Sequence, residues 1–291
     1  MPSPVSAPSI PSPSASAPAH DGQGLRIGVF DSGLGGLSVL RALRAHLPRA
    51  DLLYVADSGY APYGERDDAF IVARSQHICD FLTRQHVDSI VVACNTATAA
   101  AIHSLRLRCG SLPVIGVEPG VKPAAAQSRN HRVGVLATPG TLRSMKFRRL
   151  AERHAGEATL VLQPCPGLAR EIETGELDTP ALREMVARFS APLKEADVDT
   201  VVLGCTHYPF VSHLFQAALG PDVRILDTAA AVAQQTMRVT APLSRHEDTH
   251  SQTSGHTLLW SSGDPAHLSH VARAWLGLEA DANALPEAIA L

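Results

Sequence analysis

The stretches VDSIVVACNTAT at residues 87–98 and VDTVVLGCTHYP at residues 198–209 decide the fold of this chain. Each begins with Val-Asp, continues with β-branched and apolar residues, and reaches a cysteine six positions after the aspartate. The two aspartates are 111 positions apart, and so are the two cysteines. A short apolar run of this kind is typical of a buried strand. The sequence therefore predicts the same strand twice, each time with a thiol at its end.

Three other apolar segments recur in the same order. LRIGVF at 25–30 matches HRVGVL at 131–136, LLYV at 52–55 matches TLVL at 159–162, and PVIG at 113–116 matches VRIL at 223–226. The offset between the copies stays nearly constant and is as long as a domain. We interpret the chain as a duplicated domain and not as an array of short repeats.

Helical patterns lie between the expected strands. Leucines at positions 37, 40, 43 and 47 form an amphipathic stripe, a second stripe follows Asp67-Asp68, and a third follows Thr179-Pro180. Apolar strands that alternate with helices are typical of parallel sheets covered on both faces. The predicted fold is α/β, with two pseudo-symmetric flavodoxin-like lobes that face each other across a cleft.

The chain is long enough for two such lobes and their tails. Residues 1–20 contain 16 Pro, Ser or Ala residues, a composition that cannot offset the entropy of folding. We expect a disordered tail over 1–24, a first lobe over 25–121 and 227–277 that carries Asp31 and Cys94, and a second lobe over 122–226 that carries Cys205. Residues 278–291 are expected to be a C-terminal tail.

Composition argues against several classes of function. The net charge of −3 leaves no basic footprint for nucleic acid, and the apolar runs are too short to cross a membrane. Five scattered cysteines do not resemble a secreted disulfide framework, and the first cation is Arg26, so we expect no signal peptide and a cytoplasmic protein. Three histidines within 244–256 lack regular ligand spacing, so we expect a polar loop there and no metal site.

The two repeated cysteines are the strongest candidates for chemistry. Either thiol alone is more simply explained as a buried structural residue, but packing does not require the same residue at both copies. A redox pair normally uses closer spacing, and a zinc site needs more ligands than the nearby His207. The remaining chemistry is acid–base catalysis with Cys94 and Cys205 on opposite faces of a substrate carbon, as in a racemase or epimerase.

Other polar residues follow the expected strands. The turn DSGLGG at 31–36 is a poor match to a nucleotide loop, but its backbone N–H groups are a predicted site for a substrate carboxylate. Asp31 and Ser32 are candidates to bind substrate or to cap a helix, and Tyr63 and Arg66 lie in an exposed turn. By spacing alone, Glu173 is a solvated helix end.

Together, DSGLGGLSVL, PYGER, VVACNTATA, VIGVEP and VVLGCTHYP resemble the glutamate racemases of the aspartate/glutamate racemase superfamily. The resemblance covers about residues 25–277. It implies interconversion of L- and D-glutamate without a cofactor and a supply of D-glutamate for peptidoglycan. We also expect a homodimer with no membrane or nucleic-acid partner.

The resemblance also implies roles for individual residues. Cys94 would exchange the α-proton of D-glutamate with help from Asp31, and Cys205 that of L-glutamate with help from His207. Glu173 is the best match to an assisting glutamate, although the surrounding CPGLAREIET departs from the family pattern. The implied substrate-binding residues are Asp31, Ser32, Tyr63, Gly64, Asn95, Thr96, Thr206 and His207.

Three alternatives stay open at this point. The first is a racemase for aspartate or another small substrate on the same scaffold. The second is a cleft-type binding protein in which the thiols are incidental. The third is a regulatory role through binding another protein, which is compatible with catalysis.

Overall fold

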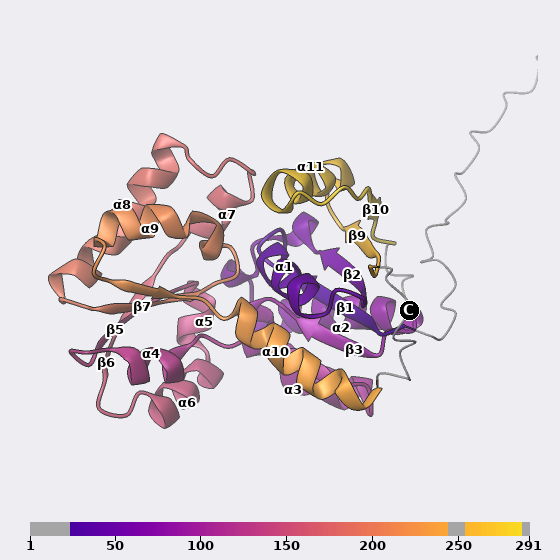
Figure 1. Cartoon of the computed structure of the whole chain (residues 1–291), viewed down its shortest axis with the longest axis horizontal. Coiled ribbons are helices and arrows are strands. Elements are labelled where there is room, and N and C mark those ends of the chain that lie inside the picture. Colours follow the sequence, from indigo (N-terminus) through magenta and orange to yellow (C-terminus); the bar gives the residue numbers. More distant parts are fainter. Residues whose placement is uncertain (1–23, 244–253, 287–291) are drawn as a thin grey trace, which may run out of the picture.

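The strands of the protein form two separate sheets in which every pairing is parallel (Figure 1). The computed structural model describes residues 24–243 and 254–286. The six-stranded sheet has the order β10 (Ala282–Ala284), β9 (Thr257–Ser261), β2 (Asp51–Ala56), β1 (Arg26–Asp31), β3 (Ser89–Val92) and β4 (Val114–Gly116). The four-stranded sheet has the order β6 (Thr159–Pro164), β5 (Arg132–Ala137), β7 (Thr200–Gly204) and β8 (Arg224–Leu226). The predicted pair of α/β lobes is confirmed.

The two sheets repeat the same register. In the first sheet, Phe30 in the central strand β1 pairs with Val92 of β3. In the second, Leu136 of β5 pairs with Leu203 of β7. These are the residues that the sequence offsets relate to each other, so the repeat in the sequence is a repeat in space. Both cysteines consequently stand at the carboxyl ends of equivalent strands, where open parallel sheets bind ligands.

Helices cover both faces of each sheet. Apolar side chains pack the first sheet between two helical layers: α1 (Leu37–His46), α10 (Ala229–Thr240) and α11 (Pro265–Leu276) on one face, and α2 (Asp68–Arg84) and α3 (Asn95–Cys109) on the other. The second sheet lies between α7 (Leu168–Ile172), α8 (Pro180–Glu195) and α9 (Ser212–Leu219) on one face, and α4 (Val121–Gln127), α5 (Pro139–Arg143) and α6 (Met145–His154) on the other. Short 3₁₀ turns complete the described chain: η1 (Ser58–Tyr60), η2 (Tyr63–Glu65), η3 (Tyr208–Val211) and η4 (Ala241–Leu243).

The helix starts follow from local chemistry. Asp67 accepts the N–H of Phe70 at 2.7 Å and caps α2. Thr179 accepts the N–H of Leu182 at 3.1 Å and caps α8, in which Pro180 is the first residue. A side-chain oxygen at this position satisfies an N–H that has no partner within the helix. Both predicted helix starts are therefore confirmed.

The chain after the second lobe returns to the first sheet. β9 pairs with β2 along its whole length, and β10 then pairs with β9. The expectation of a C-terminal tail from residue 278 was wrong for 282–284, because this short segment extends the sheet edge. Residues 1–23 of the predicted 1–24 tail, residues 244–253 of the predicted 244–256 loop, and residues 287–291 lie outside the described residues.

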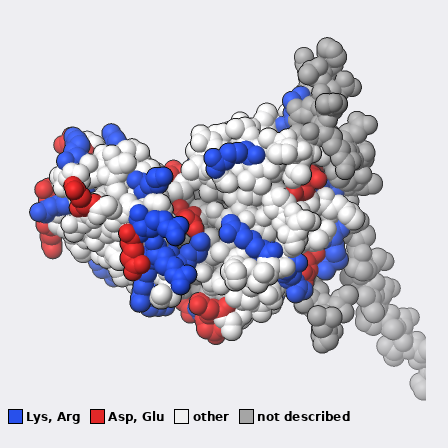
Figure 2. All heavy atoms as spheres, turned by 90° about the horizontal axis from the view of Figure 1, so that it is seen from below, with Lys and Arg blue, Asp and Glu red and all other residues white. Residues whose placement is uncertain are grey.

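Charged side chains are distributed unevenly over the surface. Figure 2 shows Lys and Arg gathering on the second lobe, next to several acidic residues. On α6, the side chains of Arg148, Arg149 and Arg153 are exposed. No helix in the described part of the chain is long and apolar enough to span a bilayer.

Candidate active site

The first thiol, Cys94, lies where β3 meets α3. Its backbone is extended, and its sulfur accepts the N–H of Ala97 at 3.4 Å, so it caps the helix. The sulfur also donates to the Ser32 hydroxyl at 3.6 Å. Burial raises the pKa of the Cys94 thiol to about 12, and the charge of Asp31 acts in the same direction. Cys94 therefore rests as a protonated thiol at neutral pH.

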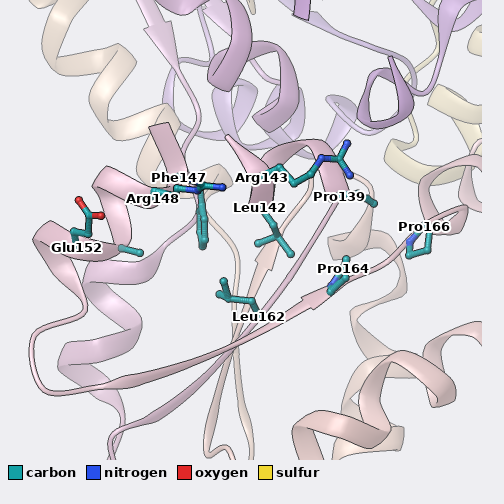
Figure 3. Close-up of a pocket in the computed structure, with 10 residues that line it drawn as sticks. Pro139, Leu142, Arg143, Phe147, Arg148, Glu152, Leu162, Pro164 and Pro166 are labelled. Carbon is teal, nitrogen blue, oxygen red and sulfur yellow. The ribbon is translucent and has the colours of Figure 1, made fainter. Parts of the chain in front are cut away.

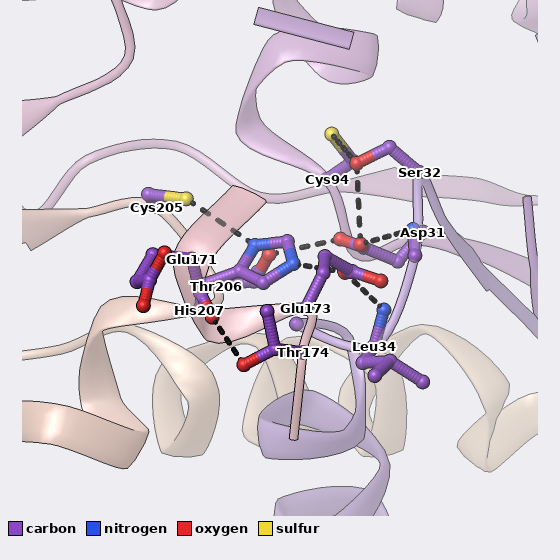
Figure 4. A network of polar contacts seen from close by, with 12 residues as sticks. Asp31, Ser32, Leu34, Cys94, Glu171, Glu173, Thr174, Cys205, Thr206 and His207 are labelled. Atoms are coloured by element: carbon purple, nitrogen blue, oxygen red, sulfur yellow. Dashed lines mark hydrogen bonds and ion pairs between the residues drawn. The ribbon is translucent and has the colours of Figure 1, made fainter. Parts of the chain in front are cut away.

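Asp31 ends β1 beside this thiol and is fully buried. Its carboxylate accepts the N–H of Gly33 at 2.9 Å and the hydroxyl of Thr206, from the other lobe, at 2.8 Å. Burial raises the pKa of Asp31, while nearby His207 opposes that shift. Asp31 thus connects the Cys94 side to the loop that carries Cys205 (Figure 4).

The second thiol, Cys205, follows β7 and has different neighbours. Its sulfur lies 3.5 Å from Nδ1 of His207, and Nε2 of His207 makes a short contact to Oε1 of Glu173. Burial alone would lower the pKa of His207, but the charge of Glu173 and its hydrogen bond raise that pKa well above its ordinary value. An imidazolium has an N–H on both sides, so His207 can donate to sulfur and carboxylate together.

Glu173 reaches this position from the end of α7. Its Oε1 also accepts the N–H of Leu34 at 2.6 Å, in the glycine-rich turn of the first lobe. The spacing-based expectation of a solvated helix end was wrong, because the side chain is only 13% exposed. In this turn, the N–H of Leu34 is therefore bound by the protein's own carboxylate, whereas Ser32 lines the cavity.

Two glycines make room for this contact. A Cβ atom on Gly33 would lie 2.1 Å from Oε1 of Glu173, and one on Gly35 would lie 2.4 Å from Nδ1 of His207. Such distances are far inside van der Waals contact. The glycine-rich turn is therefore shaped to receive two side chains from the opposite lobe.

Both thiols line one small cavity between the lobes, with a volume of about 10 Å³. Its walls come from four loops that follow strands, and from η2 and α7. The lining residues are Ser32, Pro62, Tyr63, Gly64, Cys94, Asn95, Thr96, Thr138, Ala169, Cys205, Thr206 and His207. Two thiols from equivalent strand ends consequently face a single small space.

Some polar groups at the cavity wall already have hydrogen-bond partners, and one has none. The hydroxyl of Thr96 lies 3.0 Å from that of Thr138 and 3.3 Å from that of Thr141, across the two lobes. Asn95 is buried, and its side-chain oxygen has no hydrogen-bond partner. A buried acceptor without a partner is costly unless a ligand supplies the donor.

Tyr63 presents its ring to the cavity and turns its hydroxyl away. The hydroxyl donates to Asp57 in a short contact, and Arg74 donates to the same carboxylate from Nε at 3.0 Å and from an Nη at 2.6 Å. Asp57 is fully buried. The guanidinium of Arg74 also lies 3.9 Å from the ring centroid of Tyr60. This network holds the 57–66 segment on the first lobe.

Comparison with known proteins places this arrangement in a family. The model of the Asp/Glu/Hydantoin racemase family matches residues 37–236. The chain belongs to this family. It is 48% identical over 257 residues to the glutamate racemase of Ectopseudomonas mendocina, covering 88% of this chain and 97% of that protein. It is 50% identical over 246 residues to that of Herpetosiphon aurantiacus, covering 84% and 95%.

Solved glutamate racemases share the fold. The RacE1 isoform from Bacillus anthracis superposes with a TM-score of 0.80 at 30% identity, covering 91% of this chain and 98% of that one. The Escherichia coli enzyme, solved with L-glutamate and the activator UDP-MurNAc-ala, has a TM-score of 0.78 at 31% identity, covering 90% and 98%. The racemase therefore shares both its lobes with these enzymes.

Every residue singled out from the sequence of this racemase lies at or beside the cavity, except Arg66. Arg66 is exposed and stacks on Phe70 at 5.2 Å from the ring centroid. Sequence reasoning missed Asp57, Arg74 and Thr141. Asp57 had a usable signal, since it directly follows the second strand, and Asp31 is the last residue of the first. Arg74 and Thr141 sit on helical stripes, where only the fold reveals their partners.

A second, wider hollow of the racemase lies away from both thiols (Figure 3). Apolar side chains of α5, α6 and the edge strand β6 line it, including Leu142, Phe147 and Leu162, and Arg143 and Arg148 stand at its rim. It contains none of the predicted site residues. Among residues 24–243 and 254–286, no cluster of His, Cys, Asp and Glu side chains is arranged to hold a metal ion.

Proposed function

We propose that this protein is a glutamate racemase that interconverts L- and D-glutamate by two-base catalysis, with one cysteine on each face of the α-carbon. The observation that carries the proposal is the position of Cys94 and Cys205, which face one cavity from equivalent strand ends. The relatives named glutamate racemase support glutamate over aspartate or another substrate. The product D-glutamate serves peptidoglycan synthesis.

Each turnover removes one proton from the α-carbon and returns another proton to its opposite face. For L-glutamate, Cys205 as thiolate removes the α-proton, and Cys94 as thiol donates a proton to the opposite face. For D-glutamate the roles reverse. The imidazolium of His207 stabilises negative charge on the Cys205 sulfur, and Glu173 keeps His207 charged. Burial and Asp31 keep Cys94 protonated until it is needed.

The α-hydrogen of an amino acid is a far weaker acid than a thiol, so the cavity must stabilise the carbanion. Fixed donors act strongly once water is excluded. We assign the substrate carboxylates to hydroxyls and N–H groups around Ser32, Gly64, Thr96 and Thr206, where Tyr63 forms part of the wall. The side-chain oxygen of Asn95 is free to accept the substrate ammonium. Lobe separation is the natural route of substrate entry.

Two further parts of the proposal concern the setting of the enzyme. The five cysteines are all free thiols, which supports a reducing, cytoplasmic location. We also propose a homodimer, on the family resemblance, and no nucleic-acid partner, on the net charge of −3. Analytical ultracentrifugation and binding to labelled DNA test these two statements, and the arginine-rich face of α6 is where DNA binding would first appear.

Proton exchange in D₂O tests the proposed reaction. The purified protein, without added PLP or metal, is given L- and then D-glutamate, and NMR and circular dichroism are followed together. We expect deuterium to enter Cα while optical activity decays to zero from both enantiomers. Exchange with aspartate alone would change the substrate, and a folded, reduced protein silent with all amino acids would support the binding-protein alternative.

A further inference from the structure

Two of the remaining cysteines meet outside the active site. Cys79 lies on α2, and Cys109 is the last residue of α3. The two helices pack side by side on one face of the first sheet (Figure 1), and both cysteines belong to the same apolar cluster. Each thiol is the largest influence on the pKa of the other, which indicates that they are near neighbours. No part of the proposed racemase reaction uses them.

An ion pair fixes the register of this contact. Asp80 follows Cys79, and Arg108 precedes Cys109. The guanidinium of Arg108 donates two parallel hydrogen bonds to the Asp80 carboxylate, at 2.7 Å from Nε and 2.6 Å from an Nη. A bidentate pair of this kind sets both distance and orientation. Because the ion pair joins the immediate neighbours of the two cysteines, it holds this part of α2 against the end of α3.

The two thiols have different environments. Cys79 is fully buried, whereas Cys109 is partly exposed. The neighbouring Cys79 thiol lowers the pKa of Cys109 to about 7, against the opposing effect of burial. The pKa of the catalytic Cys94 is raised to about 12, and Cys94 is buried. Since the accessible thiolate is the form that reacts with oxidants, exposure and the direction of the pKa shift both favour reaction at Cys109 over Cys94.

We propose that Cys79 and Cys109 form a reversible, redox-sensitive disulfide, in which Cys109 reacts first with a peroxide and Cys79 resolves the product. The Cys109 thiolate attacks hydrogen peroxide: an S–O bond forms, the O–O bond breaks, and hydroxide leaves and takes a proton to become water. The Cys79 thiol then loses its proton and attacks the sulfenic sulfur, so that the S–S bond forms and the oxygen leaves as a second water. Two thiols are oxidised, and one peroxide is reduced to two waters.

The disulfide lies at the end of α3 that is remote from the active site. Cys94 caps the start of α3, and Cys109 is its fifteenth and last residue, which separates them by about 22 Å along the helix. The link therefore joins α2 to α3 without touching either catalytic sulfur. We expect it to form at peroxide doses that leave the catalytic thiols reduced.

Mass spectrometry of the full chain tests the proposal without relying on any activity. One equivalent of hydrogen peroxide at pH 7.5 should lower the intact mass by about 2 Da, the loss of two hydrogens. Non-reducing peptide mapping should place the link between Cys79 and Cys109, and dithiothreitol should reverse it. Cys79→Ser should instead give a dimedone-trapped sulfenic acid at Cys109, Cys109→Ser should give neither product, and the matched control Cys165→Ser should still form the link.

A second measurement keeps the proposal testable if a variant misfolds. In the unaltered protein, iodoacetamide should alkylate Cys109 at least about tenfold faster than Cys94, as expected from the larger thiolate fraction. The proposal is overturned if peroxide oxidises Cys94 or Cys205 before any Cys79–Cys109 link appears. Equal alkylation rates for Cys109 and Cys94 would overturn it as well.

Discussion

The two sides of the active site began as copies of one strand and are supported in different ways. Cys94-Asn95-Thr96 on the first lobe corresponds to Cys205-Thr206-His207 on the second, 111 positions later. On the first side, the carboxylate comes from the end of the lobe's own central strand, at Asp31. The residue equivalent to Asp31 is Ala137, and the second side obtains its carboxylate from Glu173 on α7.

This difference gives the two sulfurs different resting environments. Cys94 is buried, lies near the carboxyl group of Asp31 and donates to the Ser32 hydroxyl. Burial and Asp31 both favour its protonated form. The sulfur of Cys205 instead lies 3.5 Å from Nδ1 of His207, whose pKa Glu173 raises. A two-base enzyme requires one acid and one base at each moment. The comparison shows that duplication positions the two sulfurs, and later divergence of their neighbours makes them unequal.

Replacing the sulfur of either catalytic cysteine by oxygen should have the largest effect on racemisation. We expect Cys94→Ser and Cys205→Ser each to lower racemisation about 10³-fold or more, because a hydroxyl is a much poorer base and acid than a thiol at neutral pH. Elimination from the two enantiomers of a halogenated glutamate analogue separates the roles. Each variant should retain elimination with one enantiomer only, and equal loss with both would contradict the assignment of one thiol to each face.

Removing the charge of Glu173 should weaken the Cys205 side alone. In Glu173→Gln, the pKa of His207 falls, because the carboxylate that raises it is gone. We expect kcat/KM to fall about 30-fold, which is less than the loss of a whole acid–base group. The fall must be equal in both directions, since the enantiomers have equal free energies, so the primary deuterium isotope effect reports the affected step.

The isotope effect in Glu173→Gln should rise more for L-glutamate than for D-glutamate. Glu176→Gln, an exposed glutamate three residues away, is the matched control and should behave as the unaltered enzyme. The pH profile gives a second readout. Activity that needs charged His207 is present below its raised pKa and lost above it, so the alkaline limb should move to lower pH in Glu173→Gln. An unmoved limb would remove His207 from the proposed role.

Asp57, which accepts the hydroxyl of Tyr63, has no counterpart on the second lobe. Asp57 follows β2, whereas the equivalent strand β6 is followed by Cys165. Asp57→Asn leaves Arg74 without its carboxylate and loosens the 57–66 segment. We expect about a tenfold loss of kcat/KM from misplacement of the cavity wall. Tyr63→Phe should lose less, because its hydroxyl points to Asp57 and not into the cavity. Asp178→Asn, which breaks a surface pair with Arg183, is the control, and a similar loss in it would refute a specific role for Asp57.

The smallest expected effect is on stability, and it concerns the repeated aspartates Asp88 and Asp199, which precede β3 and β7. Asp88 accepts the N–H of Arg26 at 2.8 Å, whereas Asp199 accepts backbone N–H groups at 2.6 and 3.0 Å and the Ser128 hydroxyl at 2.7 Å. Although burial acts to raise it, these bonds lower the pKa of Asp199 to about 2. A depressed carboxyl pKa stabilises the fold above the ordinary value, and this contribution is lost as pH falls towards about 2.

Urea unfolding of Asp88→Asn and Asp199→Asn measures this difference. We expect Asp199→Asn to lower the free energy of unfolding at pH 7 by about 1 kcal/mol more than Asp88→Asn, after allowance for solvent screening. The gap should close as the pH is lowered below 4. A larger cost for Asp88→Asn would show that the pKa shift of Asp199 does not report its contribution to stability.

The sequence by itself determined the duplicated α/β fold, both thiols and most of the cavity wall. Those features depend on local patterns, namely apolar strands, helix caps and residues that directly follow a strand. Such patterns can be recognised from residues that are neighbours along the chain. The equal offsets also paired the halves, because a repeated register must place equivalent residues at equivalent strand ends.

Only the tertiary structure decided what touches what between the lobes. Glu173 reads as a solvated helix end until α7 lies against the glycine-rich turn, where Leu34 supplies an N–H and Gly35 leaves room for His207. The ion pairs of Arg74 with Asp57 and of Arg108 with Asp80 likewise join residues that no spacing relates. Electrostatic and hydrogen-bond partners are set by distance in space, and a sequence records only distance along the chain.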